Sequence, residues 1–186
     1  DFGYFIGPIL NSCGRLNKSN LATKLIISTN KDEIKKISNQ LINLNDKRKE
    51  IEKKTINKIN LKDLISIKDK IIIIKDLTIP EGIIGIIASR FLEKFNKTTI
   101  VLTQSGNLIK GSTRSTSDIN IGSIINNAVT NKIILNGGGH NMAAGFSLYK
   151  KDFYKFKTFL FEYNLTKKDN NKEYVSKIST SAINFK

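Results

Sequence analysis

The chain has 186 residues, a length that accommodates one full domain and part of a second. Apolar residues make up 39% of it, which excludes a chain that is disordered by composition. Its apolar runs, such as residues 71–74, fall far short of the about 20 residues that a membrane-spanning helix needs. The net charge of +15 favours a polyanionic partner, with nucleic acid first.

Cysteine and histidine each occur once, as Cys13 and His140. This excludes an internal disulfide framework, a zinc site of clustered cysteines and a histidine-rich metal centre built from this sequence alone. A single cysteine fits a reducing compartment, so we expect a cytoplasmic protein. The sequence starts at Asp1 without a signal-peptide pattern, and we expect it to begin inside a longer reading frame.

The positive charge must be weighed against a strong residue bias, because the chain holds 31 Ile, 27 Lys and 21 Asn residues. Such a bias places lysine anywhere on a surface, and a purely structural domain could be basic for this reason alone. Only four residues are arginine: Arg15, Arg48, Arg90 and Arg114. Guanidinium offers a planar fork to phosphate where ammonium is a point charge, so these positions are candidates for specific roles.

The N-terminal third predicts a turn followed by helices. Residues 7–16 contain two glycines and a proline and predict a loop, and residues 21–27 predict the start of a helix. Residues 31–60 predict a long helix, capped by Asn30 with Glu33 three residues later. Its narrow apolar stripe is interrupted at Arg48 and predicts a helix that bridges two domains or packs along one edge. Its acidic residues and its basic face are expected to be solvated.

The rest of the chain predicts an α/β domain. A strand over 70–75, a helix over 83–95 and a strand over 98–103 predict a βαβ unit with parallel strands. A turn at 104–107 predicts a hairpin into a strand at 108–112. The further expected elements are a helix at 119–129, a loop at 137–140, a strand at 144–149, a helix at 152–163, a linker at 166–173 and a β element at 174–185.

Two segments are the first candidates for a binding site. Residues 111–117 combine a glycine, hydroxyl side chains and Arg114, a set that can approach and bind a phosphate; the alternative is an ordinary polar turn. Residues 137–140 place three glycines before His140. That histidine could contact a phosphate or a base or transfer a proton, and the alternative is a flexible turn with a hydrogen-bonded structural histidine.

Two weaker candidates complete the set. Residues 81–85 follow a strand at a predicted helix N-terminus, where anions bind, although helix packing explains the glycines as well. Asn11 and Arg15 flank Gly14 and could hold a phosphodiester. The chain lacks nucleotide-binding glycine loops, a serine-nucleophile elbow and a convergent carboxylate set for two metals.

Taken in order, these segments resemble the RecJ family of single-stranded-DNA exonucleases in the DHH phosphoesterase superfamily. The resemblance covers nearly the whole chain. It is carried by Gly-Pro-x-x-Asn-x-x-Gly-Arg-Leu at 7–16, the long helix at 31–60, Gly-Ile-Ile-Gly-Ile-Ile-Ala-Ser-Arg at 82–90, Lys-Gly-Ser-Thr-Arg-Ser at 110–115 and Gly-Gly-His-x-Met-Ala-Ala-Gly at 138–145.

The resemblance implies a fold class and a domain plan. The fold is α/β, a long connecting helix followed by a DHH-associated domain whose mixed sheet is flanked by helices. The implied parts are the tail of a DHH catalytic domain at 1–30, the connecting helix at 31–62, the DHH-associated domain at 63–165, and a linker with the start of a truncated OB-type domain at 166–186.

The resemblance also implies an activity, namely 5′-to-3′ hydrolysis of single-stranded DNA in repair and recombination with Mn²⁺ or Mg²⁺. The metal ligands would lie in an N-terminal domain whose motifs are absent, so this chain holds no metal site and is expected to be inactive alone. The implied catalytic residues are His140 and Arg114. The implied substrate-binding residues are Asn11, Gly14, Arg15, Lys110, Gly111, Ser112, Ser115, Gly138 and Gly139.

One departure from the family pattern is Glu81, which stands where a neutral polar residue is expected and would repel a phosphate. We expect a monomer that binds single-stranded DNA, with other repair proteins as further partners. The alternatives are a nanoRNase or cyclic-dinucleotide phosphodiesterase of the same superfamily, and a non-catalytic nucleic-acid-binding module.

Overall fold

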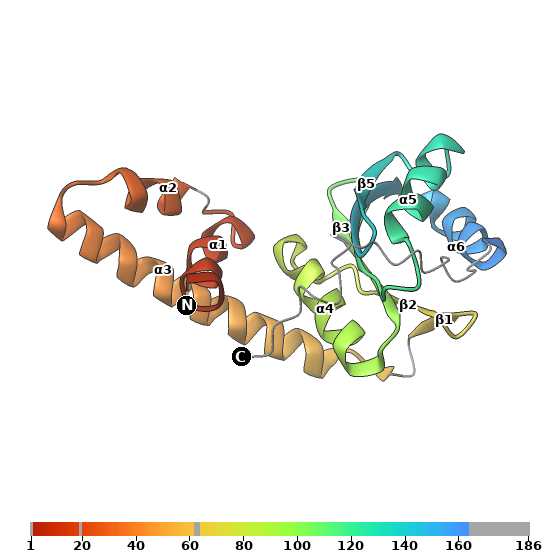
Figure 1. The fold of residues 1–186 in the computed structure, drawn as a ribbon, viewed down its shortest axis with the longest axis horizontal. Coiled ribbons are helices and arrows are strands. Elements are labelled where there is room, and N and C mark those ends of the chain that lie inside the picture. Colours follow the sequence, from red (N-terminus) through yellow and green to blue (C-terminus); the bar gives the residue numbers. More distant parts are fainter. Residues whose placement is uncertain (1, 19, 62–63, 164–186) are drawn as a thin grey trace, which may run out of the picture.

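The computed structural model describes residues 2–18, 20–61 and 64–163 (Figure 1). Two parts are visible, a long helix with short helices packed along it and an α/β domain at the C-terminal end of that helix. The helices are η1 (Phe2–Ile6), α1 (Gly7–Arg15), α2 (Asn20–Ile27), α3 (Lys31–Lys58), η3 (Glu81–Ile83), α4 (Ile84–Phe95), α5 (Ile121–Thr130), η4 (Lys150–Asp152) and α6 (Phe153–Glu162). The strands are β1 (Ile65–Ile67), β2 (Ile71–Lys75), β3 (Thr98–Ser105), β4 (Leu108–Arg114), β5 (Asn136–His140) and β6 (Ala143–Tyr149).

The long helix α3 confirms the prediction for residues 31–60. Its 28 residues span about 42 Å at 1.5 Å per residue. The Asn30 side chain caps it by accepting from the backbone N–H groups of Asp32 and Glu33. In a full capping box the Glu33 carboxylate would accept from the Asn30 backbone N–H. Here that N–H donates to the Ser28 hydroxyl at 3.3 Å, and the Glu33 carboxylate accepts from the same hydroxyl at 2.5 Å.

The predicted loop at residues 7–16 is wrong, because Gly7–Arg15 forms helix α1. Pro8 lies in the first turn, where a missing N–H breaks no helical hydrogen bond. The helix is held by packing: buried Cys13 lies against Ile37 and Leu41 of α3 in a small apolar cluster. Helix α1 is therefore anchored on α3 by its buried face.

The sheet confirms the predicted α/β class. Its six strands run in the order β1-β2-β3-β4-β6-β5, with β2 and β3 parallel and every other pair antiparallel. The βαβ unit and the β3–β4 hairpin were both predicted, whereas the three-residue strand β1 was not. Residues 166–173 and 174–185, expected as a linker and a β element, lie outside the described residues.

The predicted loop at 137–140 is also wrong, because residues 136–140 form the edge strand β5. Two of its glycines are required by packing. A Cβ on Gly137 would lie 2.7 Å from Ile125 of α5, and one on Gly139 would lie 2.3 Å from the carbonyl oxygen of Ala143. Gly138 faces open space. Gly137 thus lets the strand pass close to α5, and Gly139 lets it lie close to the start of β6.

The helices cover the two faces of the sheet unequally. One face packs its Ile, Leu and Phe side chains, with Phe146 near the centre, against α5 and α6. On the other face, α4 packs through Ile84 and Ile87 onto Ile72, Ile74 and Val101 of β2 and β3. The neighbouring part of this face, on β4, β6 and β5, contributes no residue to that cluster. Among the described helices, none is long and apolar enough to cross a membrane.

Candidate functional site

The part of the sheet next to α4 presents polar and small residues. Side chains alternate between faces along a strand, and directly paired residues of an antiparallel sheet share a face. The register therefore places three rows on this face: Lys110 with Ser147 and Asn136, Ser112 with Gly145 and Gly138, and Arg114 with Ala143 and His140.

An open pocket of about 450 Å³ lies between this sheet face, the start of α4 and the end of α1. It brings five predicted site residues together: Arg15 from α1, and Lys110, Gly111, Ser112 and Arg114 from β4, about 100 positions later in the sequence. Further lining comes from Glu81, Gly82, Ile84, Gly85, Asn136, Gly145, Phe146 and Ser147. Three cationic side chains and one carboxylate thus face a single hollow.

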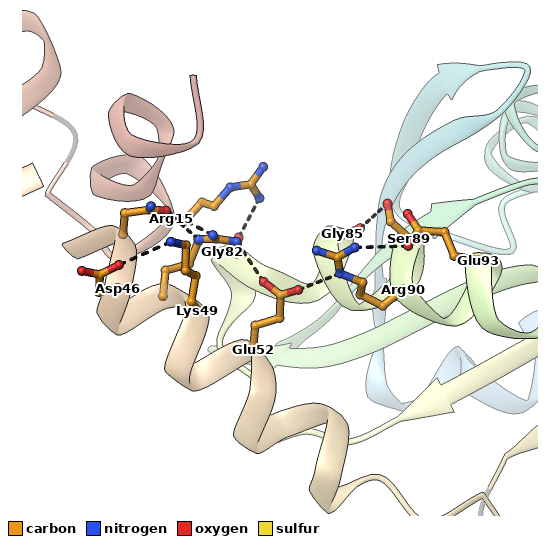
Figure 2. Close-up of polar contacts among 11 residues, drawn as sticks. Arg15, Asp46, Lys49, Glu52, Gly82, Gly85, Ser89, Arg90 and Glu93 are labelled. Carbon is orange, nitrogen blue, oxygen red and sulfur yellow. Dashed lines mark hydrogen bonds and ion pairs between the residues drawn. The ribbon is translucent and has the colours of Figure 1, made fainter. Parts of the chain in front are cut away.

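Arg15 reaches this pocket from the last turn of α1. Its Nη1 atom donates to the carbonyl oxygen of Gly82 at 3.0 Å (Figure 2). Among the described residues it forms no ion pair. Burial lowers the pKa of Arg15, and the charges of Arg48 and Arg114 lower it further, while Glu52 acts in the opposite direction. Arg15 remains charged, and it lies within the electrostatic reach of two other guanidinium groups.

Arg114 comes from the end of β4, and its Nη1 atom donates to the carbonyl oxygen of Thr113 at 2.9 Å. No acidic partner is found for it in the part of the chain that the structure describes. Gly85 leaves the space for this arrangement, because a Cβ there would lie 3.1 Å from the Ser112 hydroxyl and 3.4 Å from Nη2 of Arg114. The remaining donors of Arg114 and the Ser112 hydroxyl are available to an anion.

Lys110 is held differently from the two arginines. Its ammonium group forms an ion pair with Glu81, whose other carboxylate oxygen accepts from the Ser105 hydroxyl at 2.8 Å. The hydrogen bond from Lys110 is the main cause that lowers the pKa of Glu81 below its ordinary value. Glu81 therefore neutralises Lys110 at one side of the pocket, whereas Arg15 and Arg114 have no carboxylate partner in the part of the chain that the structure describes.

His140 lines a second open pocket of about 450 Å³, which does not include Arg114. Gly139 lines the same pocket, together with Asn120, Gly122, Ser123, Asn126, Asn141 and Met142. His140 itself is exposed at the end of the edge strand β5. The register still puts His140 and Arg114 in one row, two strands apart, so one extended ligand crossing β6 could reach both.

The other predicted site residues have different surroundings. Ser115 is buried: its hydroxyl lies 2.8 Å from Oγ1 of Thr98 and donates to the carbonyl oxygen of Ile119, which makes it a structural residue. Gly111 is also required by packing, since a Cβ there would lie 2.3 Å from the Phe146 ring. Asn11 and Gly14 are exposed on α1, with Asn11 one turn before Arg15 on the same face.

One ionic cluster was missed by the sequence analysis, and Glu52 lies at its centre (Figure 2). Its Oε2 atom accepts from Arg48 of α3 at 2.9 Å, and its Oε1 atom accepts from Arg90 of α4 at 2.8 Å. The expectation that the acidic residues of α3 are solvated is wrong for Glu52, which is 8% exposed. The signal was present in the sequence: Arg48 interrupts the apolar stripe, and Glu52 follows it by one helical turn.

Metal ligation is not apparent in residues 2–18, 20–61 and 64–163, where no group of three His, Cys, Asp or Glu side chains is placed to hold an ion.

The sequence of residues 68–164, just over half of the chain, matches the DHHA1 domain. The chain belongs to the DHHA1 family. Lys110, Ser112, Arg114 and His140 lie within the DHHA1 match, whereas Arg15 reaches the pocket from outside it.

The curated relatives are RecJ proteins, each described as a single-stranded-DNA-specific exonuclease. The chain is 33% identical to that of Escherichia coli over 170 residues and 31% identical to that of Haemophilus influenzae over 164 residues. Each match covers 84% of this chain and 28% of the relative, so the chain spans about a quarter of their length. Since the DHHA1 match covers just over half of the chain, the similarity to RecJ extends beyond it into the long helix α3.

Among solved structures, that of RecJ from Thermus thermophilus in complex with Mn²⁺ is similar, with a TM-score of 0.75 and 28% identity over 85% of this chain and 23% of the other. A second structure, of exonuclease RecJ bound to manganese, gives a TM-score of 0.70. The DHHA1 domain and its long preceding helix are therefore arranged as in RecJ.

Proposed function

We propose that this chain supplies the phosphate-binding side of a RecJ-type exonuclease that hydrolyses single-stranded DNA from its 5′ end. One observation carries the proposal: Arg15 and Arg114 come from separate parts of the fold, line one pocket, and have no acidic partner among the described residues. Placing two positive charges close together costs free energy, and an anion bound between them would offset this cost. A phosphodiester provides that anion.

The surroundings suit a phosphate in particular. A guanidinium fork can bind two phosphate oxygens at once, and the Ser112 hydroxyl can donate to a third. Gly138 and Gly145 lie in the same row and offer a strand surface that a nucleotide backbone can approach closely. The pocket thus combines charge, donors and space at one place.

The metal belongs, in this proposal, to the DHH catalytic domain of which residues 1–30 are the tail, with residues 31–62 as the connecting helix. Mn²⁺ or Mg²⁺ bound there would activate the attacking water and neutralise charge on the scissile phosphate. This chain would position the substrate: Arg15 of α1 and Arg114 of the DHHA1 domain would hold the phosphate, and His140 would contact the DNA strand from the sheet edge.

The first test is binding of a short single-stranded oligonucleotide to this chain, measured by fluorescence anisotropy at several salt concentrations. Each phosphate contact contributes about 0.7 to the slope of log affinity against log salt. Arg114→Ala should reduce that slope by about 0.7 and weaken binding. Lys150→Ala removes the same formal charge from η4 at the other end of β6 and should leave the slope unchanged. An equal effect of the two variants would contradict a specific phosphate site.

The second test uses the full-length protein that contains this chain. Arg114→Ala should lower turnover of single-stranded DNA by about 10²–10³-fold, because a fixed positive donor to the reacting phosphate is lost. Arg114→Lys keeps the charge without the fork and should recover only part of the activity. Near-normal turnover by Arg114→Ala, with unchanged thermal stability, would refute the assignment.

A further inference from the structure

The joint between α3 and α4 contains a buried carboxylate whose surroundings are unusual for a helix as polar as α3. Glu52 is 8% exposed, and its two oxygens each accept from a different arginine. A buried carboxylate is strongly unfavourable unless it is paired on all sides. Arg48 is also fixed by Asn45, a second buried polar residue of α3, through hydrogen bonds of 3.1 and 3.2 Å.

The two arginines of this cluster belong to different structural units. Arg48 extends from α3 and its side chain is 11% exposed, whereas Arg90 extends from α4 and is 53% exposed. The neighbouring pairs Lys49–Asp46 and Arg90–Glu93 each stay within one helix (Figure 2). Among the ion pairs of the described residues, Arg90–Glu52 alone joins α3 to α4.

The position of Arg15 depends on this joint. Helix α1, which carries Arg15, packs on the middle of α3 through Cys13 and Leu41, and the Ser12 hydroxyl lies 3.4 Å from the carbonyl oxygen of Leu41. The pocket that receives Arg15 belongs to the DHHA1 domain. A change in the angle between α3 and α4 therefore displaces Arg15 relative to Ser112 and Arg114.

We propose that Glu52 is a positioning residue for the phosphate pocket. By binding Arg48 of α3 and Arg90 of α4 together, it fixes the connecting helix on the DHHA1 domain and holds Arg15 in place. The choice of arginine at both positions, in a chain that uses lysine almost everywhere else, follows from this geometry, because each guanidinium serves two acceptors at once. The inference rests on the proposed function insofar as the pocket binds phosphate.

The direction in which Glu52→Gln changes oligonucleotide affinity distinguishes this role from a simple charge effect. Glu52→Gln removes a negative charge near a nucleic-acid site, and charge alone predicts tighter binding of an oligonucleotide. A positioning role predicts weaker binding, by about fivefold, because the amide keeps one acceptor oxygen and can serve only one of the two arginines, so Arg15 is no longer fixed. Glu93→Gln is the matched control: it removes the other carboxylate bound to Arg90, within α4, and should change affinity by less than about twofold.

The effect must also depend on Arg15. In an Arg15→Ala background, Glu52→Gln should add less than about twofold, because the group that it positions is gone. Tighter or unchanged binding of Glu52→Gln, or an equal loss with and without Arg15, would overturn the proposal. If Glu52→Gln does not fold, Arg90→Gln at a half-exposed residue breaks the link between α4 and Glu52, together with the Arg90–Glu93 pair that the Glu93→Gln control tests separately, and should give the same Arg15-dependent loss.

A structural readout keeps this inference separate from the proposed function. Nitroxide labels at Lys36→Cys on α3 and Lys150→Cys on η4 report the orientation of the connecting helix, and the native Cys13 is buried. Glu52→Gln should broaden the distance distribution measured by pulsed electron resonance, whereas Glu93→Gln should not. If the unmodified chain fails to bind oligonucleotide, the proposed function fails, and the distance distribution alone decides the role of Glu52. An unchanged distribution would then refute it.

Discussion

The guanidinium of Arg15 donates to the carbonyl oxygen of Gly82 at 3.0 Å, across 67 positions of the sequence. The backbone of Arg15 also lies directly against Gly82, where a Cβ would come within 2.0 Å of the Arg15 carbonyl oxygen. This contact places the end of α1 against η3, directly before α4. It brings an arginine from the N-terminal helices to a pocket otherwise built by the DHHA1 domain.

Gly82→Ala should therefore open this contact. The atoms that meet the added methyl group are backbone atoms, which cannot move aside as a flexible side chain does. We expect a loss of about 1–3 kcal/mol in the free energy of unfolding, as for other overpacked sites, together with weaker oligonucleotide binding. Chemical denaturation followed by circular dichroism measures the first effect. Gly14→Ala, in the same helix end as Arg15 but facing open space, should be neutral or stabilising by up to about 1 kcal/mol.

The glycines of β5 should separate into a structural and a binding class. Gly139→Ala meets the backbone of Ala143 and Ala144 and should destabilise the fold by about 1–3 kcal/mol. The methyl group of Gly138→Ala meets no atom within 4 Å, so the free energy of unfolding should stay within about 0.5 kcal/mol of that of the unmodified protein. If the DNA backbone crosses this row of the sheet, Gly138→Ala should still weaken oligonucleotide binding severalfold in the anisotropy assay. Unaltered affinity would remove Gly138 from the proposed site.

The Glu81–Lys110 ion pair should be lost in acid. The folded-state pKa of Glu81 lies below its ordinary value of 4.5, mainly because Lys110 donates to the carboxylate. Its contribution to stability is thus present above about pH 4.5 and disappears as the pH falls through the folded-state pKa. In Lys110→Met, a carboxyl NMR titration of Glu81 should show a higher midpoint than in the unmodified protein. An unshifted midpoint would show that Lys110 does not hold this carboxylate in solution.

Much of the architecture follows from local sequence patterns. Alternation of apolar and polar stretches is a short-range property, so it predicted α3, the βαβ unit and the β3–β4 hairpin. The two wrong secondary-structure predictions, loops at residues 7–16 and 137–140, both arose from glycine. Glycine favours turns locally, but here Gly137 and Gly139 serve close packing against α5 and β6, and Gly7 begins a helix fixed by contacts with α3.

The candidate site shows the same division. Motif resemblance named Arg15, Lys110, Ser112 and Arg114, and the structure brings all four to one pocket. It also separates residues that the motifs joined: the side chain of Ser115 is buried, and His140 lines a different pocket. A motif states which residues occur together in a sequence, and only the register of β4, β6 and β5 decides which of them share a face.

The sequence by itself determined the residue types, the family resemblance and most of the helix and strand segments, because these depend on composition, periodicity and motif order. Tertiary structure alone decided which charges are free and which are neutralised. Glu81 and Lys110 are 29 residues apart, and Glu52 and Arg90 are 38 apart, so neither pair can be inferred from local spacing. Among the described residues, Arg15 and Arg114 are the cations of the pocket without a carboxylate partner, and only the fold shows this, since charges act through space rather than along the chain.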